Sequence, residues 1–157
     1  AETDLGWRDG IMELTLKLTA QSVEDLIRAG LPVAAEAGVR VESVAPGSAR
    51  IRLPFHPGML RPGGVISGPT LFTAADTAMY ALVLAHIGPQ LMAVTSQLNI
   101  NFLRKAAPGD VIGEARMLRL GLRTAVIEVL LFTADEPEPV AQVTGSYAIP
   151  SAPAVAG

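Results

Sequence analysis

The sequence of 157 residues has no cysteine, which excludes disulfide bonds, zinc–thiolate sites and a cysteine nucleophile. Its two histidines lie far apart in the chain, so we expect neither a metal site nor a cofactor. Charged residues make up only 17% and the net charge is -3, which gives no reason to expect a nucleic-acid partner. No apolar run has both the length and the flanks of a membrane span, and the N-terminus lacks the features of a signal peptide. We therefore expect a cytoplasmic protein without a membrane partner.

Half of the residues are apolar, which excludes general disorder, and the length suits one domain with a buried core. The sequence shows no internal repeat and no linker between domains. We expect a polar tail over residues 1–12, a single domain over 13–150 and a proline-rich tail over 151–157.

The most informative segment is an apolar run that contains a single acid, Asp76. The spacing of its large apolar residues predicts a helix over Thr70–Ile87, with Ser67 as N-cap, Pro69 in the first turn and Gly88 at its end. A helix that is apolar on nearly every side lies in a core. Its acid is therefore hydrogen-bonded, lies in a cleft or is held at an interface. A purely structural role, bracing a nearby backbone amide, is an equally open interpretation.

A second helix, with the composition of a surface cover, is predicted from Thr19. It has Ser22 as its N-cap and two acids, Glu24 and Asp25, in its first turn. A proline at position 32 is expected to kink or divide this helix, and Gly38 is expected to end it.

Alternation of apolar and polar residues predicts a hairpin of strands over 39–45 and 49–54. The next ten residues, 55–64, hold two Pro-Gly pairs and are expected to form a loop that carries site residues. Further strands are predicted over 91–104, 111–120, 124–134 and 139–149. Their short connections predict antiparallel neighbours. The resulting fold class is α+β, with one antiparallel sheet wrapped around one long central helix.

Other polar residues of these elements receive structural interpretations. His86 falls in the last helical turn, where a cation meets the C-terminal dipole. Tyr80 is expected in the core or at an interface rather than in an acyl pocket. Asn99 and Asn101 alternate with apolar residues, which predicts a polar strand face near a cleft or a subunit contact.

The segment SGPTLFTAADTAMYA resembles the hotdog-fold acyl-CoA thioesterases, in the branch related to the phenylacetate-pathway enzymes. That branch has a His-Gly-Gly turn, an Asn six residues before the His, and an Asp in the central helix. Here Ser67 stands at the His, Gly68 at the first glycine and Pro69 at the second. Arg61 stands at the Asn, and Asp76 falls on the catalytic acid.

The resemblance extends over about residues 38–150 and includes the later segment AVTSQLNINFLRKAAPGD. It implies that Asp76 is the general base or nucleophile of a thioester hydrolysis. It further implies that the amide of Gly68 polarises the carbonyl oxygen at the helix N-terminus. Ser67 and Thr95 would position a water molecule or hold the carbonyl.

Coenzyme phosphates favour basic side chains near the mouth of such a site. The candidate substrate-binding residues are Arg61, Gly63, Gly64, Asn99, Arg104, Lys105, Arg119 and Arg123. For Arg104, Lys105, Arg119 and Arg123, the alternative interpretation is a solvated strand end, since Lys and Arg are mostly exposed in any protein. For Arg61, binding of an acidic acyl group, binding of a phosphate and pairing with a surface acid all remain open.

The leading hypothesis is an acyl-CoA thioesterase that hydrolyses a small, medium or aromatic acyl thioester to the free acid and CoA. The family resemblance implies a homodimer with its sites between two subunits, and a dimer of dimers. Because Ser67, Pro69 and Arg61 replace family residues, a non-catalytic module that binds acyl-CoA or lipid is the alternative. A hydratase or dehydratase is less favoured, since the Asp/His pair of hydratases is not evident.

Overall fold

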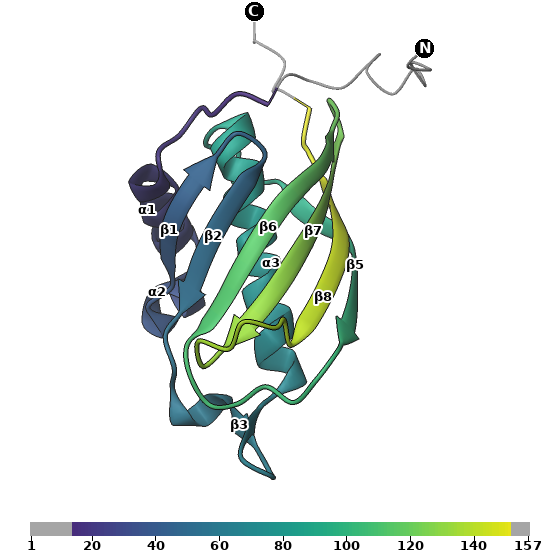
Figure 1. The fold of residues 1–157 in the computed structure, drawn as a ribbon. Coiled ribbons are helices and arrows are strands. Elements are labelled where there is room, and N and C mark those ends of the chain that lie inside the picture. The colour runs from purple at the N-terminus through teal and green to yellow at the C-terminus, as the bar shows by residue number, and fades with distance from the viewer. Residues whose placement is uncertain (1–13, 152–157) are drawn as a thin grey trace, which may run out of the picture.

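The apolar run around Asp76 forms α3, Gly68–Ile87, the central helix of the computed structural model (Figure 1). Ser67 is its N-cap, as predicted, and its hydroxyl accepts a hydrogen bond from the amide of Thr70 at 3.3 Å. Gly88 follows the last turn with a φ of 86°, a conformation that favours glycine. The helix thus begins two residues before the predicted Thr70 and ends where predicted.

The structure describes residues 14–151, so the tail expected over 1–12 and nearly all of the tail expected over 151–157 lie outside it. The other elements are α1 (Ala20–Gly30), α2 (Pro32–Ala37), β1 (Arg40–Ala45), β2 (Ser48–Leu53), a 3-10 helix (Pro57–Met59), β3 (Leu60–Arg61), β4 (Val65–Ile66), β5 (Val94–Phe102), β6 (Val111–Leu120), β7 (Thr124–Thr133) and β8 (Ala141–Ala148). The segment expected to be a loop over 55–64 thus contains a helical turn and, with residues 65–66, a small hairpin.

One antiparallel sheet of six strands, in the order β1-β2-β6-β7-β8-β5, curves around α3 (Figure 1). This is the predicted α+β hotdog architecture. The expectation that all successive strands pair is wrong for β5 and β6, because β5 pairs with β8 and β6 pairs with β2 and β7. The connection between them crosses the end of the sheet and is held there by a hydrogen bond from the Ile66 amide to the Ala106 carbonyl at 2.8 Å.

The core lies between α3 and the inner face of the sheet. Large side chains such as Leu82, Ile127 and Leu131 are fully buried there, and each contributes about 1.5–3 kcal/mol of hydrophobic stabilisation. Gly145 in β8 allows the helix to approach closely, because a Cβ at this position would lie 2.4 Å from Cε of Met79. By length and composition α3 could span a membrane, yet 72% of its apolar window is buried within the fold, as in a core helix.

The start of α1 differs from the prediction. Thr19, not Ser22, is the N-cap, and its hydroxyl accepts a hydrogen bond from the amide of Ser22 at 3.1 Å. The helix therefore begins three residues earlier than a Ser22 cap would allow, which moves Glu24 and Asp25 out of the first turn. Pro32 does divide the predicted helix, into α1 and α2.

Gly38 ends α2, as predicted, in the left-handed conformation. Beside it, α1 packs along the outer edge of β1. The Glu24 carboxylate accepts a hydrogen bond from the Val41 amide at 2.9 Å, and the Arg28 guanidinium donates to the Val39 carbonyl at 2.7 Å. These side chains satisfy backbone groups that an edge strand otherwise leaves open.

His86 is buried in the last turn of α3, but not as the expected cation. Its Nε2 accepts a hydrogen bond from the Gly47 amide at 2.9 Å, so Nδ1 carries the proton and donates to the Leu82 carbonyl at 2.8 Å. An imidazolium has no free lone pair for the Gly47 amide. The residue is therefore a neutral structural link between α3 and the β1–β2 turn.

Candidate active site

Asp76 lies in the third turn of α3, half-buried, with its carboxylate among polar groups. Its Oδ1 accepts hydrogen bonds from the Thr95 hydroxyl at 2.5 Å and from the Tyr147 hydroxyl at 3.0 Å. Its Oδ2 accepts no hydrogen bond from any residue within 14–151. One carboxylate oxygen is thus anchored and the other is available to a ligand.

Thr95 reaches Asp76 because of a bulge in β5. Thr95 lies opposite Tyr147 of β8, and Leu98 lies opposite Gly145, so both face the helix. Without an extra residue, Thr95 and Leu98 would face opposite sides of the strand. The register shift between Thr95 and Gln97 supplies that residue and turns Thr95 inward.

Tyr80 supports this arrangement from α3, one turn after Asp76. Its ring stacks on that of Tyr147, with centroids 6.0 Å apart and an interplanar angle of 15°. Its hydroxyl donates a hydrogen bond to the Leu91 carbonyl at 3.0 Å. Both rings are therefore held from more than one direction.

Both phenols remain protonated hydrogen-bond donors at ordinary pH. Burial, followed by the negative charge of Asp76, raises the pKa of Tyr147 far above its ordinary value. Burial also raises the pKa of Tyr80. The Tyr147 hydroxyl therefore donates to the Asp76 carboxylate and does not compete with it as an anion.

Tyr147 was not predicted from the sequence. The alternation of Ala141, Val143, Gly145 and Tyr147 does indicate an inward-facing position. Its partner could not be inferred, because β8 pairs with a strand that precedes it by two others in the sequence. The bulge that brings Thr95 to the same place has no sequence signal that we recognise.

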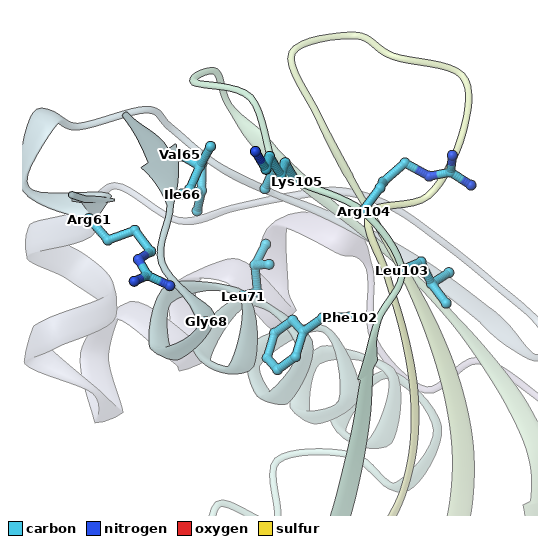
Figure 2. Close-up of a pocket in the computed structure, with 10 residues that line it drawn as sticks. Arg61, Val65, Ile66, Gly68, Leu71, Phe102, Leu103, Arg104 and Lys105 are labelled. Atoms are coloured by element: carbon cyan, nitrogen blue, oxygen red, sulfur yellow. The ribbon is translucent and has the colours of Figure 1, made fainter. Parts of the chain in front are cut away.

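A cleft of about 410 Å³ lies at the N-terminal end of α3 (Figure 2). Its lining includes the predicted residues Arg61, Gly68, Arg104 and Lys105, together with apolar side chains such as Leu71 and Phe102. The Arg61 guanidinium points toward the first turn of α3, beside Gly68 and the Phe102 ring (Figure 2). A Cβ at Gly68 would lie 3.2 Å from the tip of that ring, so a larger residue would fill the cleft.

The three cations of the cleft differ in what they contact. Arg104 forms an ion pair with Glu138 and donates to the Pro139 carbonyl at 2.9 Å. Arg61 and Lys105 form no ion pair with any residue between 14 and 151. These two remain available to an anionic ligand.

Gly63 and Gly64 form the turn between β3 and β4, with φ values of 99° and 72°. No atom lies within 4 Å of a Cβ built on either residue, so the conformation, rather than close packing, favours glycine here. Neither glycine lines the cleft. Their expected contact with substrate stays a prediction.

The remaining candidates line neither the cleft nor the surroundings of Asp76. The Ser67 hydroxyl is engaged by Thr70 within the helix cap. Asn99 is exposed in the middle of β5. Arg119 and Arg123 lie at the β6–β7 hairpin, at the end of the sheet opposite β3 (Figure 1). Substrate contacts by these residues stay predictions.

Asp76 and Gly68 lie on one helix but far from each other. They are separated by eight positions, which corresponds to about 12 Å along the axis. A carbonyl carbon and its oxygen require partners at roughly 3 Å. The two groups of a single chain therefore cannot act on the same thioester.

Comparison with known proteins places the chain in a family. A model described as "Thioesterase superfamily" matches residues 63–140. A Halobacterium salinarum protein named "putative esterase" is 34% identical in an alignment of 122 residues that covers 71% of this chain and 80% of that protein.

Solved structures agree with this placement. A structure described as a "putative thioesterase" from Silicibacter sp. TM1040 superimposes with a TM-score of 0.80 at 35% identity, covering 88% of this chain and 96% of that one. The Escherichia coli PaaI protein of the phenylacetic acid degradation operon shares the fold, with a TM-score of 0.73 at 23% identity over 84% of this chain and 94% of that one. The chain belongs to the thioesterase superfamily, has its hotdog fold and is a hydrolase of the thioester or ester type.

Proposed function

We propose that the protein hydrolyses an acyl-CoA thioester with a small or medium acyl group, aromatic groups included, to the free acid and CoA. The observation that carries the proposal is the Asp76 carboxylate, which has Oδ1 anchored and Oδ2 open. As a general base, Oδ2 takes a proton from water while the water oxygen attacks the carbonyl carbon. The C–S bond then breaks, and the thiolate leaves and takes up a proton. As a nucleophile, Oδ2 would instead form an anhydride that water opens.

The second half of the site comes from another copy of the chain in this proposal. Asp76 and Thr95 lie near the start of β5, and Gly68 lies against Phe102 at its end. Antiparallel pairing of two β5 strands around Asn99 would place the start of each strand, near Asp76, beside the end of the other strand, near Gly68. The exposed side chains of Val94 and Phe102, with 56% and 57% of their surface accessible, support such a contact.

In that arrangement Gly68 faces the substrate carbonyl of the partner's site. Its amide is among the first amides of α3, which have no acceptor inside the helix. The helix dipole there favours the negative charge that develops on the carbonyl oxygen. Arg61 and Lys105, in the same cleft, would hold the coenzyme phosphates or an acidic acyl group. The dimer of dimers that the family resemblance implies stays a prediction.

A non-catalytic module that binds acyl-CoA or lipid is the second candidate. The Ser67 hydroxyl, which occupies the position of the family's His, is used to cap α3. It therefore offers the substrate less than an imidazole would. Binding without thiol release would favour this candidate.

The test is a thiol-release assay over short-chain, medium-chain and aromatic acyl-CoA. Asp76→Asn keeps an acceptor for Thr95 and Tyr147 but removes the base, so kcat/KM should fall by about 10²–10⁴. Asp25→Asn, at an exposed position of α1, is the matched control and should keep wild-type activity. Equal turnover by wild type and Asp76→Asn would reject the proposal, and saturable binding with no turnover by wild type would establish the binding module.

A further inference from the structure

We infer that Tyr147 is a positioning residue of the hydrolytic site, holding Oδ1 of Asp76 together with Thr95 so that Oδ2 faces the reacting group. The inference rests on the proposed function of Asp76. It concerns a buried side chain that is absent from the catalytic roles suggested by the family resemblance.

The contacts account for such a role. The Tyr147 hydroxyl lies 3.0 Å from Oδ1 of Asp76 and 3.3 Å from the backbone carbonyl oxygen of the same residue. The final torsion of an aspartate has a broad, roughly two-fold distribution, so an isolated carboxylate samples many orientations. Two donors that converge on one oxygen restrict this torsion and fix the direction of the other oxygen. A reactive atom held in this way approaches the substrate in fewer unproductive orientations.

Tyr147 is itself rigid enough to impose that geometry. Only 3% of its surface is exposed, and it lies directly opposite Thr95 in the β5–β8 pair. The stacked ring of Tyr80 limits rotation of the phenol, and Tyr80 is in turn tied to the Leu91 carbonyl. Within residues 14–151, both hydrogen-bond acceptors of the Tyr147 hydroxyl belong to Asp76. The hydroxyl of this buried tyrosine thus donates to the candidate catalytic residue.

Tyr147 does not take part in proton transfer in this account. Its raised pKa keeps the phenol neutral, so it donates a hydrogen bond before, during and after the reaction. Tyr147 therefore acts through Asp76 and does not contact the substrate.

The experiment compares Tyr147→Phe with Tyr80→Phe, the only other tyrosine in the chain. Tyr147→Phe removes a single oxygen that contacts Asp76, and kcat for acyl-CoA hydrolysis should fall about 10-fold with little change in KM. Tyr80→Phe removes an oxygen that contacts the Leu91 carbonyl and not Asp76, so its kcat should fall less than that of Tyr147→Phe.

A merely structural Tyr147 gives a different result. The free energy of unfolding would then fall, while kcat per folded molecule stays unchanged, and this outcome overturns the inference. Thr95→Val provides a second variant, and the losses caused by Thr95→Val and Tyr147→Phe should be non-additive, since both act on Oδ1. Full activity of Asp76→Asn would reject the proposed function itself, whereas an inactive Asp76→Asn with an unaffected Tyr147→Phe rejects only this inference.

Discussion

The two edge strands of the sheet, β1 and β5, differ in whether other parts of the chain cover them. At β1, side chains of α1 bind backbone groups where the strand begins, with Glu24 bound to the Val41 amide and Arg28 to the carbonyl of Val39, which lies just before the strand. At β5, no helix formed by residues 14–151 lies along the edge (Figure 1), and the strand exposes apolar side chains such as Val94 and Phe102. One edge is therefore closed by the chain itself, and the other is left open.

The open edge is also the edge that lies beside the candidate catalytic groups. Thr95 near one end of β5 contacts Asp76, and Phe102 at the other end lies against Gly68. An exposed edge strand ordinarily invites uncontrolled pairing and is blunted by charge, proline or cover. The β5 edge lies open beside both halves of the candidate site. A second copy of the chain that covers this edge and completes the site would explain why it is left open.

The largest predicted effect comes from charging the centre of the open edge. Asn99→Lys places two like charges near each other where the β5 strands would meet, so the dimer should dissociate. Activity should then fall by about 10²–10³, as when an oxyanion donor is lost. Sedimentation and thiol release are the measurements.

Two controls separate this effect from others. Asn99→Ser adds no charge and should remain dimeric and active, which excludes a substrate contact of the amide as the cause. Ser43→Lys puts the same charge on the closed edge at β1 and should change neither mass nor activity. A monomeric Asn99→Lys protein with wild-type turnover would contradict the account.

The closed edge should respond in stability instead of activity. Glu24→Ala removes a charged acceptor of the Val41 amide, so the free energy of unfolding should fall by about 2 kcal/mol. Urea unfolding measures this change, with Asp25→Ala, the exposed neighbour, as control. The uncovered edge should also make the variant associate at high concentration. Unchanged unfolding would show that α1 does not secure this edge.

Gly145→Ala tests how tightly the open edge is held to the helix. The added Cβ would lie 2.4 Å from Cε of Met79 and 2.9 Å from the backbone oxygen of Gln97 in β5. The methionine can move, but the backbone oxygen can do so only if β5 shifts, so a loss of about 1–3 kcal/mol is expected. Gly121→Ala is the control at an uncrowded glycine, where the nearest such atom is 3.5 Å away. Equal stabilities of the two variants would refute this packing argument.

The smallest predicted effect is a dependence on alkaline pH. Burial and the charge of Asp76 raise the pKa of Tyr147 above its ordinary 10.0, so the folded state keeps a proton that the unfolded chain releases. The resulting stability is complete below pH 10 and is lost as the pH rises further, at no more than about 1.4 kcal/mol per pH unit. Urea unfolding at increasing pH should show a shallower decline for Tyr147→Phe than for wild type. Parallel declines would contradict the prediction.

Much of this fold can be predicted from the chain, because its signals are local. The apolar run with Ser67 before it and Gly88 after it determines α3, and alternation determines the strands. The pairing of β5 could not be predicted from connection length, since a short loop that crosses the end of the sheet resembles a hairpin turn in sequence. Thr19 was missed as a cap because Ser22 offers the same chemistry three residues later.

The candidate site likewise contains one residue that the sequence makes conspicuous and others that it does not. Asp76 is conspicuous because an acid in a buried helix requires a partner, and the structure provides Thr95 and Tyr147. Tyr147 itself is inconspicuous, since one more aromatic residue in a strand usually indicates core packing. Its orientation depends on the β5–β8 register and on the bulge after Thr95, which only the folded chain reveals.

Subunit complementation is the most direct test of the claim that two copies build one site. Asp76→Asn and Gly68→Leu each disable one half of the site, so the separate variants should be nearly inactive. After unfolding and refolding as an equal mixture, half of the dimers combine the two chains, and each such dimer contains one intact site. Activity should then return to about a quarter of the wild-type value. A mixture no more active than the two variants measured apart would contradict a site shared between subunits.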